Sequence, residues 1–211
     1  MYKNREEAAE ALVHLLQDYK NQEEVLVLAI PRGGAVIASI ISQKLKVPWD
    51  LVIPKKIGAP FNPELAIGVV MQDGTIIKKE DASISYGIED SYFENEKNTL
   101  LKEIKRRFDI YREGKPFPEL KGKTIILTDD GIATGFTVKG AVEFLKGKDP
   151  KEIILAVPVA PPDALLEIEP MVDKIVCPLR PEFFFAVGQF YENFTQITDE
   201  EVINLFNSQS F

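Results

Sequence analysis

Two adjacent carboxylates, Asp129 and Asp130, occupy the most chemically informative point of this 211-residue sequence. They follow an apolar run at 124–128 and precede a turn of small and hydroxyl residues that leads into a helical pattern. Carboxylate oxygens placed there can accept hydrogen bonds from vicinal ribose hydroxyls and can attract a hydrated Mg2+. Because they would repel a phosphate directly, we expect a phosphate to lie beside the acid pair.

The turn after the acid pair, residues 131–137, has the composition of a phosphate site. Its backbone amides and those of the first helical turn would point at a common centre, and the helix dipole adds positive potential. The hydroxyls of Thr134 and Thr137 would assist. The sequence therefore predicts that a phosphorylated sugar binds at this turn.

The elements that must position these residues form two strand–helix–strand units. The patterns predict alternating strands and helices at 25–30, 35–45, 50–54, 124–128, 137–145 and 152–157. The first strand is an uninterrupted apolar run, which is typical of a strand buried on both faces of a parallel sheet. Glycine-containing turns after two such strands converge on the carboxyl edge of the sheet, where open α/β sheets bind ligands.

The remaining segments predict an insertion and two capped helices. Asp73-Gly74 between strands at 65–70 and 75–78 predicts a β-hairpin, and 89–112 predicts an amphipathic helix. Asn4 with Glu7, and Thr198 with Glu201, are capping patterns that predict an opening helix and a final short helix.

The predicted fold class is α/β, with a doubly wound, mostly parallel sheet in a single domain over 1–211. Its core covers about 20–175 and includes the inserted hairpin and helix at about 65–115. A small aromatic-rich hood follows at about 176–211.

Composition excludes several classes of protein. A formal charge of -8 has the wrong sign for coating nucleic acid phosphates, so no nucleic-acid partner is expected. The single cysteine, Cys177, has no partner for an internal disulfide, and the single histidine, His14, excludes both a histidine metal cluster and a Ser-His-Asp set. The opening residues show neither a signal peptide nor a membrane span, so the expectation is a soluble cytoplasmic protein.

At residues 127–137 the sequence resembles the fingerprint of the type I phosphoribosyltransferases. That fingerprint is a hydrophobic strand, two acidic residues, two variable residues, and then a small residue, Thr, Gly and a hydroxyl residue. The resemblance covers about 25–194, and Pro31-Arg32-Gly33-Gly34 stands where the family holds pyrophosphate. The segments VLAIPRGGAV, KIGAPFNPE and FFAVGQFY are similar to a branch whose substrate is unassigned.

The resemblance implies a set of roles around 5-phosphoribosyl 1-pyrophosphate with Mg2+. Asp129 and Asp130 would hold the ribose hydroxyls, while Arg32, Gly33 and Gly34 would hold the pyrophosphate, because the guanidinium is a planar fork and glycine allows close amide approach. The 5-phosphate would be held by Ala133, Thr134, Gly135, Phe136 and Thr137. Lys55 and Lys56, together with Arg32, are the candidate catalytic cations.

The acceptor would be a small nitrogenous base. Purine-salvage members have a short base-pocket segment in which an aromatic ring stacks on the base. Phe185, Val187 and Glu192 match that segment here. The family's 6-oxopurine enzymes carry an aspartate where this chain has Ala133, which argues against hypoxanthine or guanine. Phe136 replaces a small residue, so its ring would narrow the phosphate loop or turn outward.

Three functions are compatible with these residues. The leading one is magnesium-dependent phosphoribosyl transfer to a base, in nucleotide metabolism or salvage, with a homodimer left open. The second is a non-catalytic regulator that senses the donor or a nucleotide on the same fold. The third is an α/β phosphoester enzyme with Asp129 as nucleophile, but Thr134-Gly135 suits a phosphate cradle better.

Overall fold

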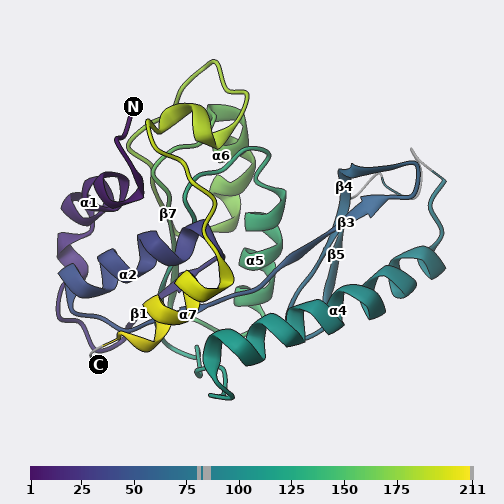
Figure 1. Ribbon diagram of the computed structural model, residues 1–211, viewed down its shortest axis with the longest axis horizontal. Coiled ribbons are helices and arrows are strands. Elements are labelled where there is room, and N and C mark those ends of the chain that lie inside the picture. Colours follow the sequence, from purple (N-terminus) through teal and green to yellow (C-terminus); the bar gives the residue numbers. More distant parts are fainter. Residues whose placement is uncertain (80–81, 83–86, 210–211) are drawn as a thin grey trace.

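A computed structural model describes residues 1–79, 82 and 87–209 of the chain. Its centre is a five-stranded parallel sheet of order β2-β1-β6-β7-β8 (Figure 1). The strands are β1 (Val25–Ala29), β2 (Trp49–Leu51), β6 (Thr124–Thr128), β7 (Glu152–Ala156) and β8 (Lys174–Val176). The chain runs from β1 to β2 on one side and returns to β6 on the other, so the direction of winding reverses between β1 and β6. In doubly wound sheets ligands bind at such a reversal.

Alternate residues of β1 pack into two separate apolar cores. Val25, Val27 and Ala29 belong to one core, together with α1 (Arg5–Leu15), α2 (Gly33–Leu45) and α7 (Asp199–Asn207). Leu26 and Leu28 belong to the other core, with α5 (Phe136–Lys146) and α6 (Pro162–Ile168). The predicted strand buried on both faces is therefore confirmed.

The predicted insertion is confirmed and is larger than expected. It contains β3 (Lys55–Ala59), β4 (Asn62–Val70), β5 (Ile76–Lys78) and α4 (Asp90–Arg112), with the three strands in an antiparallel sheet. Gly74 has φ of 87° in the predicted hairpin turn. Figure 1 shows this sheet and the start of α4 projecting away from the parallel sheet; we call residues 55–78 and 90–100 the arm. Positions 80–81 and 83–86 of the predicted insertion lie outside the described residues.

Both capping predictions are confirmed. The Glu7 amide donates to Asn4 Oδ1 at 3.0 Å, and α1 begins at the next residue after Asn4. At α7, the Glu201 amide donates to Thr198 Oγ1 at 3.1 Å and the Thr198 amide donates to Glu201 Oε2 at 2.7 Å. These bonds satisfy amides that a helix start otherwise leaves unpaired.

The segment after β8 forms the predicted hood. It contains the short helix η3 (Val187–Phe190) and runs back beside the amino terminus, where Tyr2 and Tyr191 form a parallel bridge. Two further short helices are η1 (Gln17–Tyr19) and η2 (Glu169–Met171). No helix in the described part of the chain is long and apolar enough to span a bilayer.

Candidate active site

The acid pair lies at the carboxyl end of β6, as predicted. The Asp130 amide donates to Asp129 Oδ1 at 2.8 Å, which fixes the turn. Burial raises the pKa of the Asp129 carboxyl well above its usual value, and the neighbouring Asp130 carboxylate raises it further. Burial also raises the pKa of Asp130, while Arg5 opposes that shift. The two desolvated carboxyls therefore favour a cation or hydroxyl donors as neighbours.

The glycine turn after β1 packs directly on the acid pair. A Cβ added to Gly33 would lie 1.8 Å from Asp130 Oδ2, and one added to Gly34 would lie 3.0 Å from the Asp129 Cα. A side chain at Gly33 would therefore displace the Asp130 carboxylate, and one at Gly34 would push on the backbone of Asp129. The predicted convergence of the two turns is therefore confirmed, at the point where the sheet reverses its winding.

Arg32 immediately precedes α2, and its guanidinium forms an ion pair with α7. Its Nη1 lies 3.8 Å from Asp199 Oδ1 at the start of α7. The Tyr111 hydroxyl of α4 donates to the same oxygen at 2.6 Å, and this bond holds the pKa of Asp199 below its usual value. The guanidinium is partly exposed between the glycine turn and α7, so α7 and α4 both help to position it.

The predicted phosphate loop is open to solvent at its tip. Ala133 and Thr134 are exposed, and Gly135 adopts φ of 73° directly before α5, with no side chain capping the helix. Thr137 lies half-buried in the first turn. The Phe136 ring packs against the core that contains α5 and α6, so it does not fill the loop. The first amides of an uncapped helix of 11 residues are suited to an anion.

A cleft with a volume of about 1080 Å³ adjoins this loop, between the arm and α5. Its lining residues are Lys56, Leu65, Ala66, Ile76, Ile77, Lys78, Lys79, Thr134, Phe136, Lys139, Glu143, Glu167 and Met171. Four lysines thus line this cleft, and two of them are ion-paired, Lys78 with Asp90 and Lys139 with Glu167.

The structure separates the two predicted catalytic lysines. Lys56 lines the cleft, but the Lys55 ammonium forms a 2.6 Å ion pair with Glu103 of α4. Both residues lie in β3, which the sequence did not predict. Successive side chains of a strand point to opposite faces, so neighbouring lysines cannot reach one site together.

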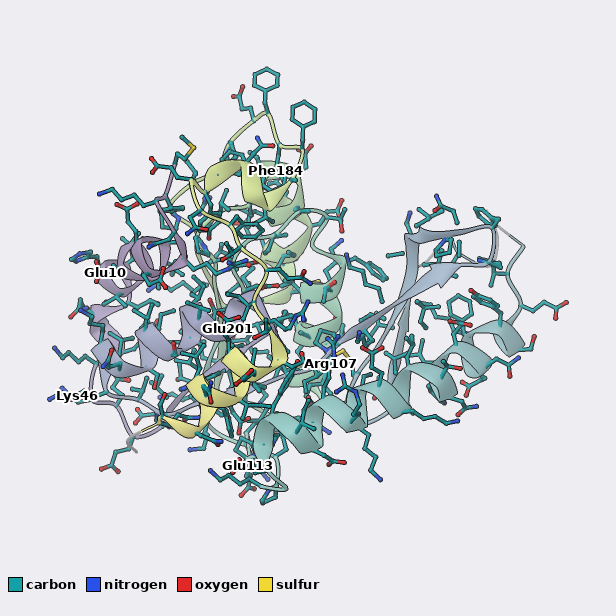
Figure 2. The ribbon with its side chains drawn as sticks, in the orientation of Figure 1. Glu10, Lys46, Arg107, Glu113, Phe184 and Glu201 are labelled. Carbon is teal, nitrogen blue, oxygen red and sulfur yellow. The ribbon has the colours of Figure 1, made fainter. Side chains whose placement is uncertain are left out.

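The three predicted base-pocket residues lie in different surroundings. Phe185 is 90% exposed. Phe184, labelled in Figure 2, packs on Phe190 with ring centroids 5.1 Å apart. Val187 contacts the acid turn, since a Cβ added to Gly131 would lie 2.5 Å from its Cγ1. Glu192 is exposed. Of the three, only Val187 touches the turn that carries the acid pair.

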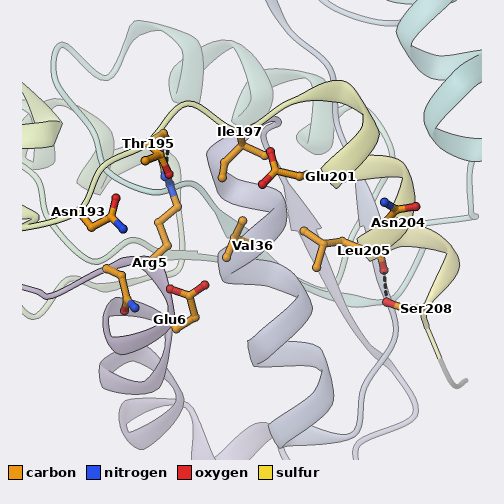
Figure 3. Close-up of a pocket in the computed structure, with 11 residues that line it drawn as sticks. Arg5, Glu6, Val36, Asn193, Thr195, Ile197, Glu201, Asn204, Leu205 and Ser208 are labelled. Carbon is orange, nitrogen blue, oxygen red and sulfur yellow. Dashed lines mark hydrogen bonds between the residues drawn. The ribbon is translucent and has the colours of Figure 1, made fainter.

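Two residues of this region were not predicted. Arg5 of α1 forms an ion pair with Asp130 at 2.8 Å, and the Tyr191 hydroxyl donates to the Asp130 carbonyl at 2.6 Å. Arg5 follows the N-cap of α1, where an arginine is ordinarily solvated, and it lies 125 positions from its partner. No local pattern signals such a contact. Arg5 also lines a cavity of about 590 Å³ between α1, α2 and α7 (Figure 3).

The phosphoribosyl transferase domain family matches this chain over residues 1–195. Rv0571c of Mycobacterium tuberculosis strain H37Rv, named provisionally as a phosphoribosyl transferase, is 34% identical over 203 residues, which cover 96% of this chain and 46% of that protein. MT0597 of strain CDC 1551 matches to the same extent. The chain therefore spans about half the length of the curated relatives it matches.

Solved structures show the same architecture. TT1426 from Thermus thermophilus superposes with a TM-score of 0.83 at 32% identity, over 98% of this chain and 97% of that chain. The AQ2163 protein from Aquifex aeolicus gives a TM-score of 0.53 at 16% identity, over 87% of this chain and 76% of that chain, and shows the fold alone. This chain belongs to the phosphoribosyl transferase domain family, so the family resemblance and the α/β fold class predicted from the sequence are confirmed.

Proposed function

We propose that this chain transfers the phosphoribosyl group of 5-phosphoribosyl 1-pyrophosphate to a nitrogenous base and releases pyrophosphate. The observation that carries the proposal is the contact between the glycine turn after β1 and the acid turn after β6, with the uncapped start of α5 beyond them. Such an arrangement would provide three adjacent subsites in the order that the donor needs.

In this proposal the start of α5 holds the 5-phosphate. The amides of Gly135, Phe136 and Thr137 and the exposed Thr134 hydroxyl supply its donors, with Ala133 at the exposed tip. The acid pair holds the ribose hydroxyls, and Arg32, Gly33 and Gly34 hold the pyrophosphate. Lys56, at the cleft beside the loop, is the lysine better placed to add positive charge, because Lys55 is paired with Glu103.

Magnesium fits this residue set as a partner of the substrate. Among the described residues, no group of three or more His, Cys, Asp or Glu side chains is placed to hold a metal ion. Mg2+ commonly binds through one or two carboxylates, waters and substrate phosphates, and the desolvated acid pair supplies the carboxylates. When bound, Mg2+ would neutralise charge on the leaving pyrophosphate.

The reaction in this proposal is a displacement at the anomeric carbon. The bond from that carbon to the pyrophosphate oxygen breaks, the oxygen keeps the electron pair, and the acceptor nitrogen forms the new bond and loses its proton to solvent. The chain's residues orient the two reactants, and the Arg32 guanidinium and glycine-turn amides stabilise the departing anion. A positioned proton donor for pyrophosphate is not needed, because pyrophosphate is itself a stable anion.

The acceptor in this proposal is a small heterocycle other than a 6-oxopurine, because Ala133 offers no proton acceptor. The hood supplies Val187 beside the acid turn, with Phe185 and Glu192 at its exposed surface. A cytoplasmic location and a homodimer are further predictions of the proposal. The alternative function, a regulator that senses the donor without turnover, would use the same two turns and the same helix start.

Turnover separates the two functions. The donor with Mg2+ is mixed with the protein and a panel of purine, pyrimidine and smaller nitrogenous bases, and released pyrophosphate is measured. The enzyme predicts base-dependent release by the wild type and a large loss in Asp129→Asn. Donor binding without release on any base would support the sensor, and no donor binding would contradict both functions.

A further inference from the structure

Arg5 clamps the acid pair through Asp130. Its Nε donates to Asp130 Oδ2 at 2.8 Å, its Nη2 forms an ion pair with the same oxygen at 2.8 Å, and the Arg5 side chain is 8% exposed. Both contacts end on one oxygen, so the guanidinium holds Asp130 Oδ2 in place and uses only one of the two carboxylate oxygens. The clamp also touches the glycine turn, because a Cβ on Gly33 would lie 3.1 Å from Arg5 Nε.

The rest of the guanidinium is held by the hood. Nη1 donates to the Thr195 carbonyl at 2.8 Å (Figure 3). The Arg5 Cζ lies 4.0 Å from the centre of the Phe194 ring. The ring supplies a cation–π contact, which is stronger for a desolvated cation. Every nitrogen of Arg5 is therefore engaged, and the residue itself is not free to bind a ligand.

The charges at this site explain why a fixed cation is needed there. Two desolvated carboxylates lie side by side, next to the turn where the proposed function places pyrophosphate. Without a counter-charge, the two carboxylates would repel each other and would also repel the incoming polyanion. Arg5 offsets one of the two negative charges and approaches from the side of Asp130 that faces the glycine turn.

We propose that Arg5 is a positioning residue for the donor: it orients Asp130, offsets its charge, and thereby holds the acid turn and the glycine turn in the geometry that binds the ribose and pyrophosphate. This inference rests on the proposed function. It assigns a part in donor binding to α1, an element outside both donor-binding turns.

The test is a double-mutant cycle on donor affinity, measured by titration calorimetry with 5-phosphoribosyl 1-pyrophosphate and Mg2+. Arg5→Gln is made in the wild type and in Asp130→Asn. We expect Arg5→Gln to weaken binding about tenfold or more in the wild type, the size of one lost charged hydrogen bond, and less than about twofold in Asp130→Asn. Non-additivity is the signature of an effect that passes through Asp130.

Two further variants separate positioning from folding. Arg5→Lys keeps the charge but loses the paired donors, so it should recover only part of the affinity. Arg112→Lys is the matched control: Arg112 is another buried arginine, ion-paired with Asp50 on β2, so its loss should lower stability without changing the donor affinity of the folded protein.

Several outcomes would overturn the inference. An unchanged affinity in Arg5→Gln, an equal loss in both backgrounds, or full recovery in Arg5→Lys would each remove the positioning role while leaving the proposed function intact. If Arg5→Gln does not fold, Arg5→Lys is compared in the same two backgrounds. A wild-type chain that binds no donor would remove the proposed function and this inference together.

Discussion

Replacing Gly33 by alanine tests the contact between the two turns. The added Cβ would lie 1.8 Å from Asp130 Oδ2, and ordinary contact at 3.4 Å requires the two atoms to separate by about 1.6 Å more. Asp130 cannot retreat that far and keep both 2.8 Å contacts with Arg5. Each hydrogen bond to a charged group contributes about 1.5–3 kcal/mol. Because the Nε hydrogen bond and the Nη2 ion pair end on one oxygen and the site can partly relax, we expect the free energy of unfolding to fall by about 2–4 kcal/mol.

The assay is urea denaturation followed by fluorescence, with Gly147→Ala as the matched control. Gly147 has φ of -65°, and an added Cβ would meet its nearest atom at 3.5 Å, so alanine should fit there without strain. In an Asp130→Ala background, Gly33→Ala should cost far less, because the clashing carboxylate is absent. An unfolding midpoint for Gly33→Ala equal to that of Gly147→Ala, or an equal loss in both backgrounds, would refute the packing argument.

Three further results are expected. Thr134→Val should weaken donor binding about tenfold to a hundredfold, measured by calorimetry, with an unchanged unfolding midpoint because Thr134 is exposed. Asp129→Asn should stabilise the protein at pH 7. Because the pKa of Asp129 is higher in the folded than in the unfolded state, the wild type loses stability as the pH rises from the unfolded towards the folded pKa. The stability gained by the variant should therefore vanish when denaturation is measured below about pH 4. Cys177, whose pKa burial raises to about 11, should react with iodoacetamide at pH 8 only after unfolding, and rapid native-state alkylation would contradict this.

The parallel sheet and its turns could be predicted because their signals are local. An apolar run such as 25–29 can be buried on both faces only in a covered sheet, and Asp129-Asp130 follow their strand directly. The caps at Asn4 and Thr198 are equally local, since donor and acceptor lie three positions apart. These features required no knowledge of distant contacts.

The strand β3 could not be predicted from its residues. It opens with Lys55-Lys56, contains Gly58 and pairs irregularly with β4, so it lacks both an apolar run and a clean alternation. Its formation depends on the partner strand β4. This strand decides which lysine can reach the site, because Lys55 pairs with Glu103 while Lys56 lines the cleft.

The Arg5 clamp was hidden for a different reason. Arg5 and Asp130 come from elements far apart in the chain, and Thr195 and Phe194, which complete the clamp, lie beyond the parallel sheet in sequence. Such a contact depends on how three segments pack together. The sequence therefore could not predict this contact, which exists only because the fold places the start of α1 against the acid turn.

The most direct test of the account is a crystal structure with 5-phosphoribosyl 1-pyrophosphate and Mg2+. We predict the 5-phosphate within hydrogen-bond distance of the amides that begin α5, the ribose hydroxyls on Asp129 and Asp130, and the pyrophosphate against Arg32 and the glycine turn. A donor bound in the lysine-lined cleft or under the hood, with both turns empty, would contradict the account.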